Sequence, residues 1–441
     1  MKLISIRITL LFLFLAIPVA WAMGRRPPVE DQVLISPSSP LKLTLGDCYE
    51  LALRRSETVA IQKEEIKEAE AQFFIASSEA IGDLDFIMQR TLQQELPTTS
   101  DESVSGSFRD PDRRERRFTL TQPLFQGFKA LGALTGAGSL RRQQKEEWRR
   151  ARQLLLLDVA QAFYGLLRER KNVETVTGIY SLFQERIKEL TGREEIGRSR
   201  TSEVVTAQAR LKVLEAERAR SVGALAAAQN LLEFLTGIQL DGRELYEEGF
   251  SSDVPRVLED YLESMESRPD VEAAKQAAKT AWQAVIVEQS AFWPKVTLEH
   301  NRYDRREGLQ SQIDWDLLFK INVPLSRGGE TLGKVKQAVS RWKKAKLAYR
   351  KAKREAALDI KQNYEHWTTS LEETQALTEA VRGSEENFRL QKEEYAHNLV
   401  SNLDVLEALR SLHETRREAN AAHYRMKENY WRLRVASGEV L

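Results

Sequence analysis

The side chains that most often carry catalytic or metal chemistry are few and scattered in this sequence. Its five histidines show no His-Glu-x-x-His spacing, and a single cysteine cannot form a Cys-pair metal motif. These residues are His300, His366, His397, His413, His423 and Cys48. We therefore predict no catalytic residue, no metal site and no cofactor, and we expect the histidines to be mostly solvated. The cysteine can form no intramolecular disulfide and is expected to lie buried near a helix start.

Two acids have a spacing that could serve a function. Asp404 and Glu407 lie three residues apart just after a helix-breaking turn, so they share one face of the following helix. A three-fold assembly would bring six such carboxylates near one axis, and a ring of like charges favours bound cations. The alternative interpretation is that both acids merely stabilise a helix N-terminus. Both interpretations are open at this point.

The N-terminal residues have the composition of an export signal. Lys2 and Arg7 precede an apolar run from Ile8 to Ala20, and Ala22 ends a small-residue site where we predict cleavage. The alternative, a membrane anchor, needs about twenty apolar residues, which is more than this run provides. We predict a signal peptide at 1–22 and a linker at 23–40. No cysteine follows the apolar run directly, so the cleavage site offers no sulfur for an N-terminal lipid.

The charge balance excludes one class of partner. The sequence has 66 basic and 65 acidic residues, and both basic residues in the signal are lost on cleavage. Nucleic-acid binders usually carry a strong basic excess on one face, so we predict no nucleic-acid partner. No later segment has about eighteen consecutive apolar residues, so any membrane crossing must be made by strands closed into a barrel.

An internal repeat divides the remaining sequence. Three segments recur at a displacement of 201 residues, and proline-free stretches rich in Ala, Leu, Glu, Lys and Arg follow in both copies. The first copies are Gln122–Gly127, Asp158–Phe163 and Glu203–Ala207, and the second are Val323–Gly328, Asp359–Tyr364 and Asp404–Ala408. We predict repeats at 41–246 and 247–438, each with the order helix, two strands, two long helices.

The repeat starts indicate how the elements begin. Asp47 and Asp260 are expected to be N-caps of helices of about thirty residues, at a displacement of 213. The displacement falls from 213 at the repeat starts to 201 further along, so the first repeat has about twelve extra residues. We expect these residues in a surface loop at Pro97–Asp112. We expect Pro123 and Pro324 to mark equivalent strand-to-helix transitions, since proline fits neither interior.

Alternating residues predict one strand pair in each repeat. From 312 to 323 apolar and polar residues alternate, broken only by Leu318, and a weaker run from Val296 to Glu299 supplies the partner strand. In the first repeat we expect apolar residues of one strand to face those of the other: Leu84, Phe86 and Met88 against Phe118 and Leu120. The same pattern fits a half-buried sheet of a soluble domain.

The long helices determine the shape of the molecule. The stretch after Gly127 predicts a helix of about 65 residues, which is about 100 Å long, and a second one follows Gly329. Helices of this length must bury their apolar seams against each other, so we expect a rod or tube. Gly132 and Gly136 indicate close helix packing, since no Gly-Lys-Ser or Gly-Lys-Thr of a nucleotide loop follows.

In the order and duplication of these segments, the chain resembles the TolC-type outer-membrane efflux proteins over essentially all of its mature length. The segments that carry the resemblance lead to Asp47 and Asp260, surround Pro123 and Pro324, and form the turns before Glu203 and Asp404. The resemblance implies a mainly α protein with a small β part. It further implies a homotrimer with a 12-stranded outer-membrane β-barrel and a periplasmic helical tunnel.

The resemblance also implies a function and its residues. It implies passive conduction of substrates from an inner-membrane pump and a periplasmic adaptor, which docks at the turns of Gly197 and Asn398. Acidic rings at Asp404 and Glu407 would narrow the periplasmic entrance. Tyr395 and Glu203 would form a lock, although the family's basic residue of this turn falls at the uncharged Val400. The alternative from another class is a periplasmic coiled-coil scaffold or adaptor without a pore, in which the strand pairs have no role.

Overall fold

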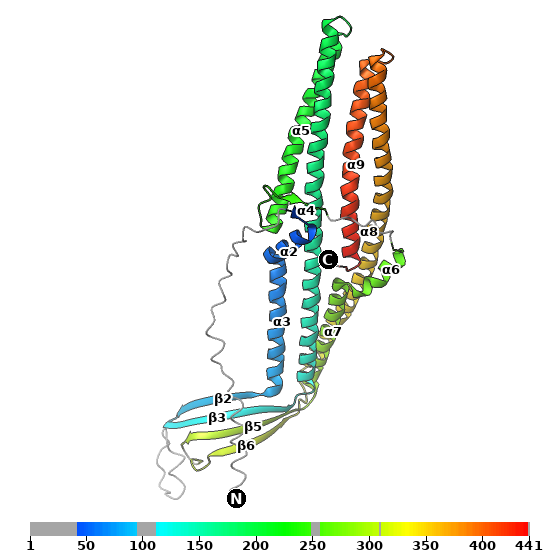
Figure 1. Cartoon of the computed structure of the whole chain (residues 1–441). Helices are drawn as coiled ribbons and strands as arrows, with labels where there is room; N and C mark the ends of the chain where they lie inside the picture. Colours follow the sequence, from blue (N-terminus) through cyan, green and yellow to red (C-terminus); the bar gives the residue numbers. More distant parts are fainter. Residues whose placement is uncertain (1–41, 95–111, 248–255, 308–309, 440–441) are drawn as a thin grey trace, which may run out of the picture.

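The molecule is elongated, with a sheet at one end and two helical hairpins at the other (Figure 1). The computed structural model describes residues 42–94, 112–247, 256–307 and 310–439. The predicted export signal, the linker at 23–40 and the expected surface loop up to residue 111 lie outside the described residues. Among the described residues, no helix combines the length and the apolar composition needed to cross a membrane.

The two repeats share one order of long elements, a helix, two strands and two long helices, as the duplication predicts. The helices α4 and α8 have 67 residues each and begin 201 residues apart, as do α5 and α9. The first repeat contains β1 (Lys42–Leu43), α2 (Leu45–Arg55), α3 (Glu57–Ile81), β2 (Asp83–Leu92), β3 (Asp112–Phe125), α4 (Lys129–Glu195), α5 (Thr201–Thr236) and β4 (Glu244–Leu245). The second contains α6 (Leu258–Glu263), η3 (Ser264–Ser267), α7 (Pro269–Gln289), η4 (Ser290–Phe292), β5 (Lys295–Arg306), β6 (Trp315–Asn322), α8 (Glu330–Ala396) and α9 (Asn402–Ala436).

The helix at the start of each repeat differs from the prediction. Asp47 is not the N-cap of α2, because Thr44 holds that position and bonds reciprocally with Asp47 in a capping box. The expected thirty-residue helix is broken where the Ser56 side chain caps a new helix, α3. In the second repeat α6 has only six residues, and α7 begins at Pro269, since proline fits the first turn of a helix.

The four long strands form one antiparallel sheet in the order β2-β3-β5-β6. Its register pairs Leu84 with Leu120 and Phe86 with Phe118, as predicted, whereas Met88 faces Arg116. Strand β5 is longer than the four-residue segment that the sequence indicated, because polar residues continue it to Arg306. A two-stranded parallel pair, β1 with β4, was not predicted from the sequence; each strand has only two residues, too few to show alternation.

Helix α4 contacts the helices α3, α5, α7 and α9. Gly132 and Gly136 allow the close approach that was predicted: a Cβ atom at Gly132 would lie 3.1 Å from Val287 on α7. Helix α5 continues the line of α3, and α9 continues that of α7 (Figure 1). The largest apolar core lies where these helices meet the short elements at mid-length, and Cys48 is fully buried in it, as expected. Burial and the nearby Asp47 carboxylate raise the pKa of the Cys48 thiol to about 12.

Candidate functional site at the helix tips

Each hairpin ends in a tight turn at the end of the molecule farthest from the sheet (Figure 1). Gly197 and Asn398 adopt left-handed backbone conformations, with φ angles of 70° and 57°. The two turns have equivalent backbone hydrogen bonds: the amide of Arg198 donates to Arg193 at 2.7 Å, and that of Leu399 donates to Glu394 at 2.9 Å. Asparagine tolerates this conformation, so the second turn keeps the geometry of the first without glycine.

Asp404 lies at the start of α9 and takes part in its cap. Its carboxylate accepts hydrogen bonds from the hydroxyl and the amide of Ser401 at 2.6 and 2.8 Å, and these bonds hold its pKa below the usual range. The capping interpretation is therefore correct for this acid. The carboxylate nevertheless remains exposed and charged, so capping leaves it available to ions.

Glu407 takes no part in the cap. Its side chain is 60% exposed, and one of its oxygens lies 3.9 Å from the Arg210 guanidinium of α5. Both acids are thus solvent-facing on the first two turns of α9. Helix capping accounts for Asp404 alone and leaves Glu407 unexplained.

Tyr395 is buried between two arginines of the first repeat. The guanidinium carbons of Arg186 and Arg193 lie 3.8 and 4.4 Å from its ring centroid. Glu203 accepts a hydrogen bond from Ser199 at 2.7 Å, and within the described chain no hydrogen bond joins it to Tyr395. Tyr395 therefore bridges the hairpins through cations on α4 and not through this acid of the same chain.

Arg186 is the residue at the tips that sequence reasoning missed. It is buried, and its Nε and Nη2 atoms donate to the Asn402 side-chain oxygen at 3.0 and 2.8 Å. Its Nη1 atom donates to Glu189 at 2.7 Å. One charged group thus joins α4 to the first residue of α9 and covers the face of Tyr395. Arginine is common along this helix, and nothing in the local sequence distinguishes this one.

More polar contacts join the hairpins between the tips and the middle of the molecule. Glu217 on α5 accepts hydrogen bonds from Arg417 at 2.7 Å, and His413 Nε2 lies 3.2 Å from the same carboxylate. His413 is buried and is an exception to the expectation that the histidines are mostly solvated. The side of α9 that carries His413 faces the first hairpin, and the sequence alone does not indicate which side of this helix does so.

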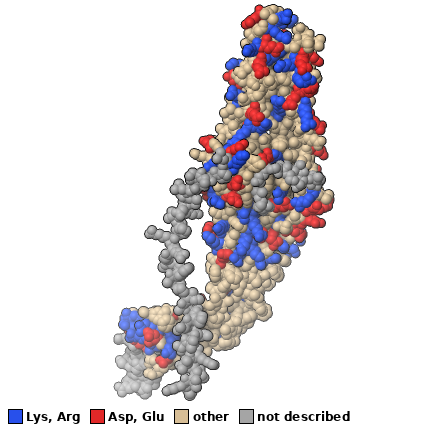
Figure 2. Space-filling view, in the orientation of Figure 1, with Lys and Arg blue, Asp and Glu red and all other residues tan. Residues whose placement is uncertain are grey.

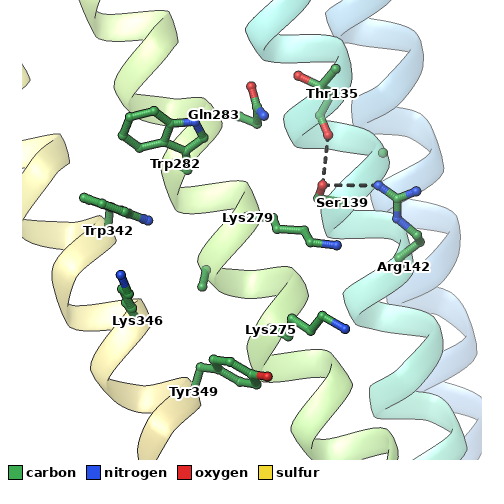
Figure 3. Close-up of a pocket in the computed structure, with 12 residues that line it drawn as sticks. Thr135, Ser139, Arg142, Lys275, Lys279, Trp282, Gln283, Trp342, Lys346 and Tyr349 are labelled. Atoms are coloured by element: carbon green, nitrogen blue, oxygen red, sulfur yellow. Dashed lines mark hydrogen bonds between the residues drawn. The ribbon is translucent and has the colours of Figure 1, made fainter. Parts of the chain in front are cut away.

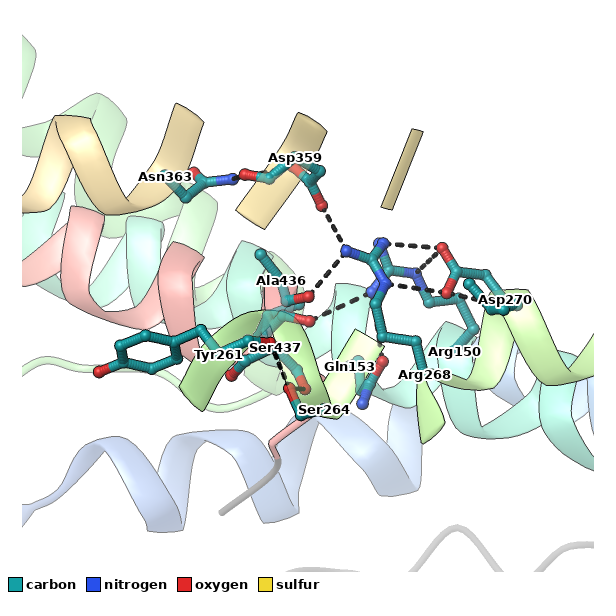
Figure 4. Close-up of polar contacts among 12 residues, drawn as sticks. Arg150, Gln153, Tyr261, Ser264, Arg268, Asp270, Asp359, Asn363, Ala436 and Ser437 are labelled. Carbon is teal, nitrogen blue, oxygen red and sulfur yellow. Dashed lines mark hydrogen bonds and ion pairs between the residues drawn. The ribbon is translucent and has the colours of Figure 1, made fainter. Parts of the chain in front are cut away.

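A buried arginine holds together the helix ends at mid-length (Figure 4). Arg268, just before α7, binds Asp270 through two hydrogen bonds of 3.0 and 2.7 Å. Its Nη1 atom donates to Asp359 on α8 at 2.9 Å and to the Ala436 carbonyl at 2.7 Å. Burial alone would lower the pKa of this guanidinium, but the bonds to Asp270 raise it. The second hairpin is therefore anchored where α7 begins and α9 ends.

The sheet has one polar and one apolar face. Thr119 donates to Asn301 at 2.7 Å, and Asp316 accepts bonds from Asn301 and Tyr303, each at 2.8 Å. The opposite face carries many exposed apolar side chains and also the exposed Arg302, which pairs with Phe118 in the register. The apolar residues are Leu84, Phe86, Met88, Phe118, Leu317, Phe319 and Ile321. Pro123 lies in β3 at a register shift two residues before the strand ends, and Pro324 lies two residues after β6.

Comparison with known proteins agrees with this architecture. A family profile described as "Outer membrane efflux protein" matches residues 261–439, which is most of the second repeat. The first repeat has the same order of long helices and strands, and its α4 and α5 begin 201 residues before α8 and α9. The matched part of the chain belongs to the outer membrane efflux protein family. This is a family of transport proteins and not of enzymes.

Individual relatives of this efflux protein are distant in sequence and near in fold. It is 23% identical to the alkaline protease secretion protein AprF of Pseudomonas aeruginosa, over 75% of this chain and 70% of that protein. It is 21% identical to the proteases secretion protein PrtF of Dickeya chrysanthemi, over 94% and 93% of the chains. The crystal structure of VceC from Vibrio cholerae superposes with a TM-score of 0.77 and 23% identity, covering 90% of this chain and 96% of that one.

Proposed function

We propose that this efflux protein is the outer-membrane exit duct of a tripartite efflux pump or a type I secretion system. The observation that carries the proposal is one four-stranded sheet, apolar on one face, from which helices of about 100 Å extend. The sheet would lie in the outer membrane and the helices would cross the periplasm. The relatives' names point to protein secretion and to cation efflux.

The duct is closed by three copies of the chain. Within the described residues the sheet ends at β2 and β6, and four strands are too few for a barrel, which needs at least about eight. The helical layer also ends in exposed apolar side chains, with Phe74 and Ile75 on α3 and Leu347 and Leu358 on α8. Joining α3 of one copy to α8 of the next would bury these residues and give twelve strands in total.

The surface next to the sheet supports the membrane orientation. Figure 2 shows few charged side chains on the helices beside the sheet, whereas charges are frequent from the middle to the tips. Aromatic and aliphatic residues are exposed where strands become helices: Phe128, Phe292, Trp293 and Leu325. Aromatic residues at this level are typical of a membrane interface.

The tips would contact a periplasmic adaptor that connects the duct to an inner-membrane pump. The turns at Gly197 and Asn398 are exposed, and each has an exposed aliphatic neighbour, Ile196 and Leu399. Leu399 is 74% exposed at this end of the molecule, where a docked adaptor would cover it. Adaptor binding here would act directly on the neighbouring contacts of Arg186.

We expect the protein to remain with the outer-membrane fraction, to require detergent for extraction and to have the mass of three chains in native mass spectrometry. The reason is that the apolar sheet face and the free edges of β2 and β6 are buried only in a closed assembly. A protein released with the soluble periplasm would instead support the coiled-coil scaffold. A stable monomer that conducts ions would contradict the trimer.

Asp404→Asn combined with Glu407→Gln is expected to reduce cation selectivity several-fold and to abolish block by divalent cations in single-channel recordings. In a trimer the two positions form rings of carboxylates, and charges about 8 Å apart repel by roughly 0.5 to 2 kcal/mol per pair, which favours bound cations. The side-chain oxygen of asparagine can still accept the hydrogen bonds from Ser401, the N-cap residue, so the cap of α9 is retained. Because the pKa of Asp404 is lowered, we expect its contribution to cation selectivity to be constant between pH 5 and 8.

Glu379→Gln is the matched control, since it removes an exposed acid from α8 away from the turn. Its currents should equal those of the wild type. If the double variant assembles as a trimer with unchanged cation preference, the two acids do not form the proposed ring.

A further inference from the structure

A groove of about 690 Å³ crosses the face of α7 between its two neighbours, α4 and α8 (Figure 3). Its volume is within the range of small-molecule sites, and most of its lining is apolar. The residues that matter below are Arg142 on α4, Lys279 and Trp282 on α7, and Trp342 and Lys346 on α8. The proposed duct assigns no role to this groove.

Two indole rings form the apolar part of the groove. The ring centroids of Trp282 and Trp342 are 4.8 Å apart with an interplanar angle of 53°, so the pair spans the seam between α7 and α8. Trp282 is 40% exposed, although burying a side chain of this size is strongly favourable. The rings therefore present an accessible aromatic surface of the kind that holds a flat or aliphatic body.

The charges around the groove are positive and mostly uncompensated. Lys275 is paired with Glu272 at 2.9 Å, but no acid forms an ion pair with Arg142, Lys279 or Lys346 in the described part of the chain. The Arg142 guanidinium has only a long contact of 3.4 Å to the Ser139 hydroxyl, and the Lys346 ammonium lies 5.5 Å from the Trp342 ring centroid. Three cations beside an apolar surface favour a ligand that is itself amphipathic and anionic.

The groove lies away from the proposed contacts between copies. It is centred on α7, which has neighbours on both sides, whereas the proposed contacts between copies use α3 and the far side of α8. Trp342, Lys346, Tyr349 and Lys353 follow one face of α8 at helical spacing, and Lys353 pairs with Glu266 of η3. The groove therefore opens on the side of the chain that carries η3.

We propose that this groove is a binding site for amphipathic organic anions. The aromatic or aliphatic body of the ligand packs on Trp282 and Trp342, and its sulfonate or carboxylate group lies among Arg142, Lys279 and Lys346. All the residues that line this site belong to one chain. The proposal therefore does not depend on the gate or on which substrate is transported.

The test uses the purified full-length protein in a nonionic detergent at fixed concentration, with 8-anilinonaphthalene-1-sulfonate as the anionic probe. N-phenyl-1-naphthylamine is the matched uncharged probe. We expect saturable binding of the sulfonate with energy transfer from tryptophan. Lys279→Gln with Lys346→Gln should weaken sulfonate binding at least five-fold and leave the uncharged probe unaffected, since both side chains lie at the surface.

Lys336→Gln with Lys343→Gln is the control, because it removes two exposed cations of α8 that do not line the groove. It should bind the sulfonate like the wild type. Trp282→Ala with Trp342→Ala should lose binding of both probes, with helix content and oligomeric mass checked in parallel. The proposal is overturned if all variants bind the sulfonate equally, or if both lysine pairs weaken it by the same factor.

Discussion

Replacing Arg186 by leucine is expected to raise the open probability of the assembled channel strongly. The variant loses the two hydrogen bonds to Asn402 and the stacking on Tyr395, which join α4 of the first hairpin to the second hairpin. Charge-assisted hydrogen bonds and a desolvated cation–π contact together contribute about 3 kcal/mol. This corresponds to roughly a hundredfold change in the ratio of open to closed tips. Single-channel conductance in planar bilayers measures it.

Arg149→Leu is the matched control for this experiment. Arg149 lies on the same helix and is well exposed, and among the described residues it pairs only with Glu146, three residues earlier. Its loss should therefore leave conductance unchanged. Asn402→Leu should open the tips in the same way as the Arg186 variant, and the double variant should add little, since both remove one contact. Unchanged conductance in an assembled Arg186→Leu trimer would show that this contact does not hold the tips closed.

The tips show where sequence reasoning succeeds and where it fails. The turn positions Gly197 and Asn398 and the capping position of Asp404 follow from local backbone chemistry, which a single sequence contains. The contact between Arg186 and Asn402 joins residues 216 positions apart, and both residue types are common on helix surfaces. No local pattern distinguishes them from solvated neighbours, so only the packing of two hairpins identifies the pair.

The fold shows the same difference between features that the sequence indicates and features that depend on packing. The repeat could be predicted because a fixed displacement of 201 residues is a long-range signal within one sequence. The helix breaks at Ser56 and Pro269 were missed. The start of α2 was also misplaced, because aspartate fits an N-cap as well as the third helical position that Asp47 occupies. The burial of His413 was missed for a related reason. This residue lies where the second repeat packs on the first, and the periodicity of apolar residues does not indicate which helix face makes that contact.

The mid-length cluster around Arg268 allows a test of how the second hairpin is held. Arg268→Met is expected to lower the free energy of unfolding by about 2 to 4 kcal/mol, because it leaves the Ala436 carbonyl and two carboxylates without their buried partner. The lower part of this range takes account of Asp270 and Asp359, whose side chains are 34% and 41% exposed. Thermal unfolding of the detergent-solubilised protein, followed by circular dichroism, measures the loss.

The first repeat supplies the control for Arg268. Arg55 occupies the equivalent position 213 residues earlier and is exposed, so Arg55→Met should change the midpoint of unfolding little. The pH dependence gives a second check. Although burial would raise it, the pKa of Asp270 is lowered because Arg268 binds the carboxylate, so this pair stabilises the fold above the ordinary aspartate pKa of about 3.9. That stabilisation disappears as the pH falls through the lowered pKa. The difference between wild type and Arg268→Met should therefore be constant from pH 8 to 5 and shrink below pH 4, whereas a difference that persists in acid would assign the role of Arg268 to packing alone.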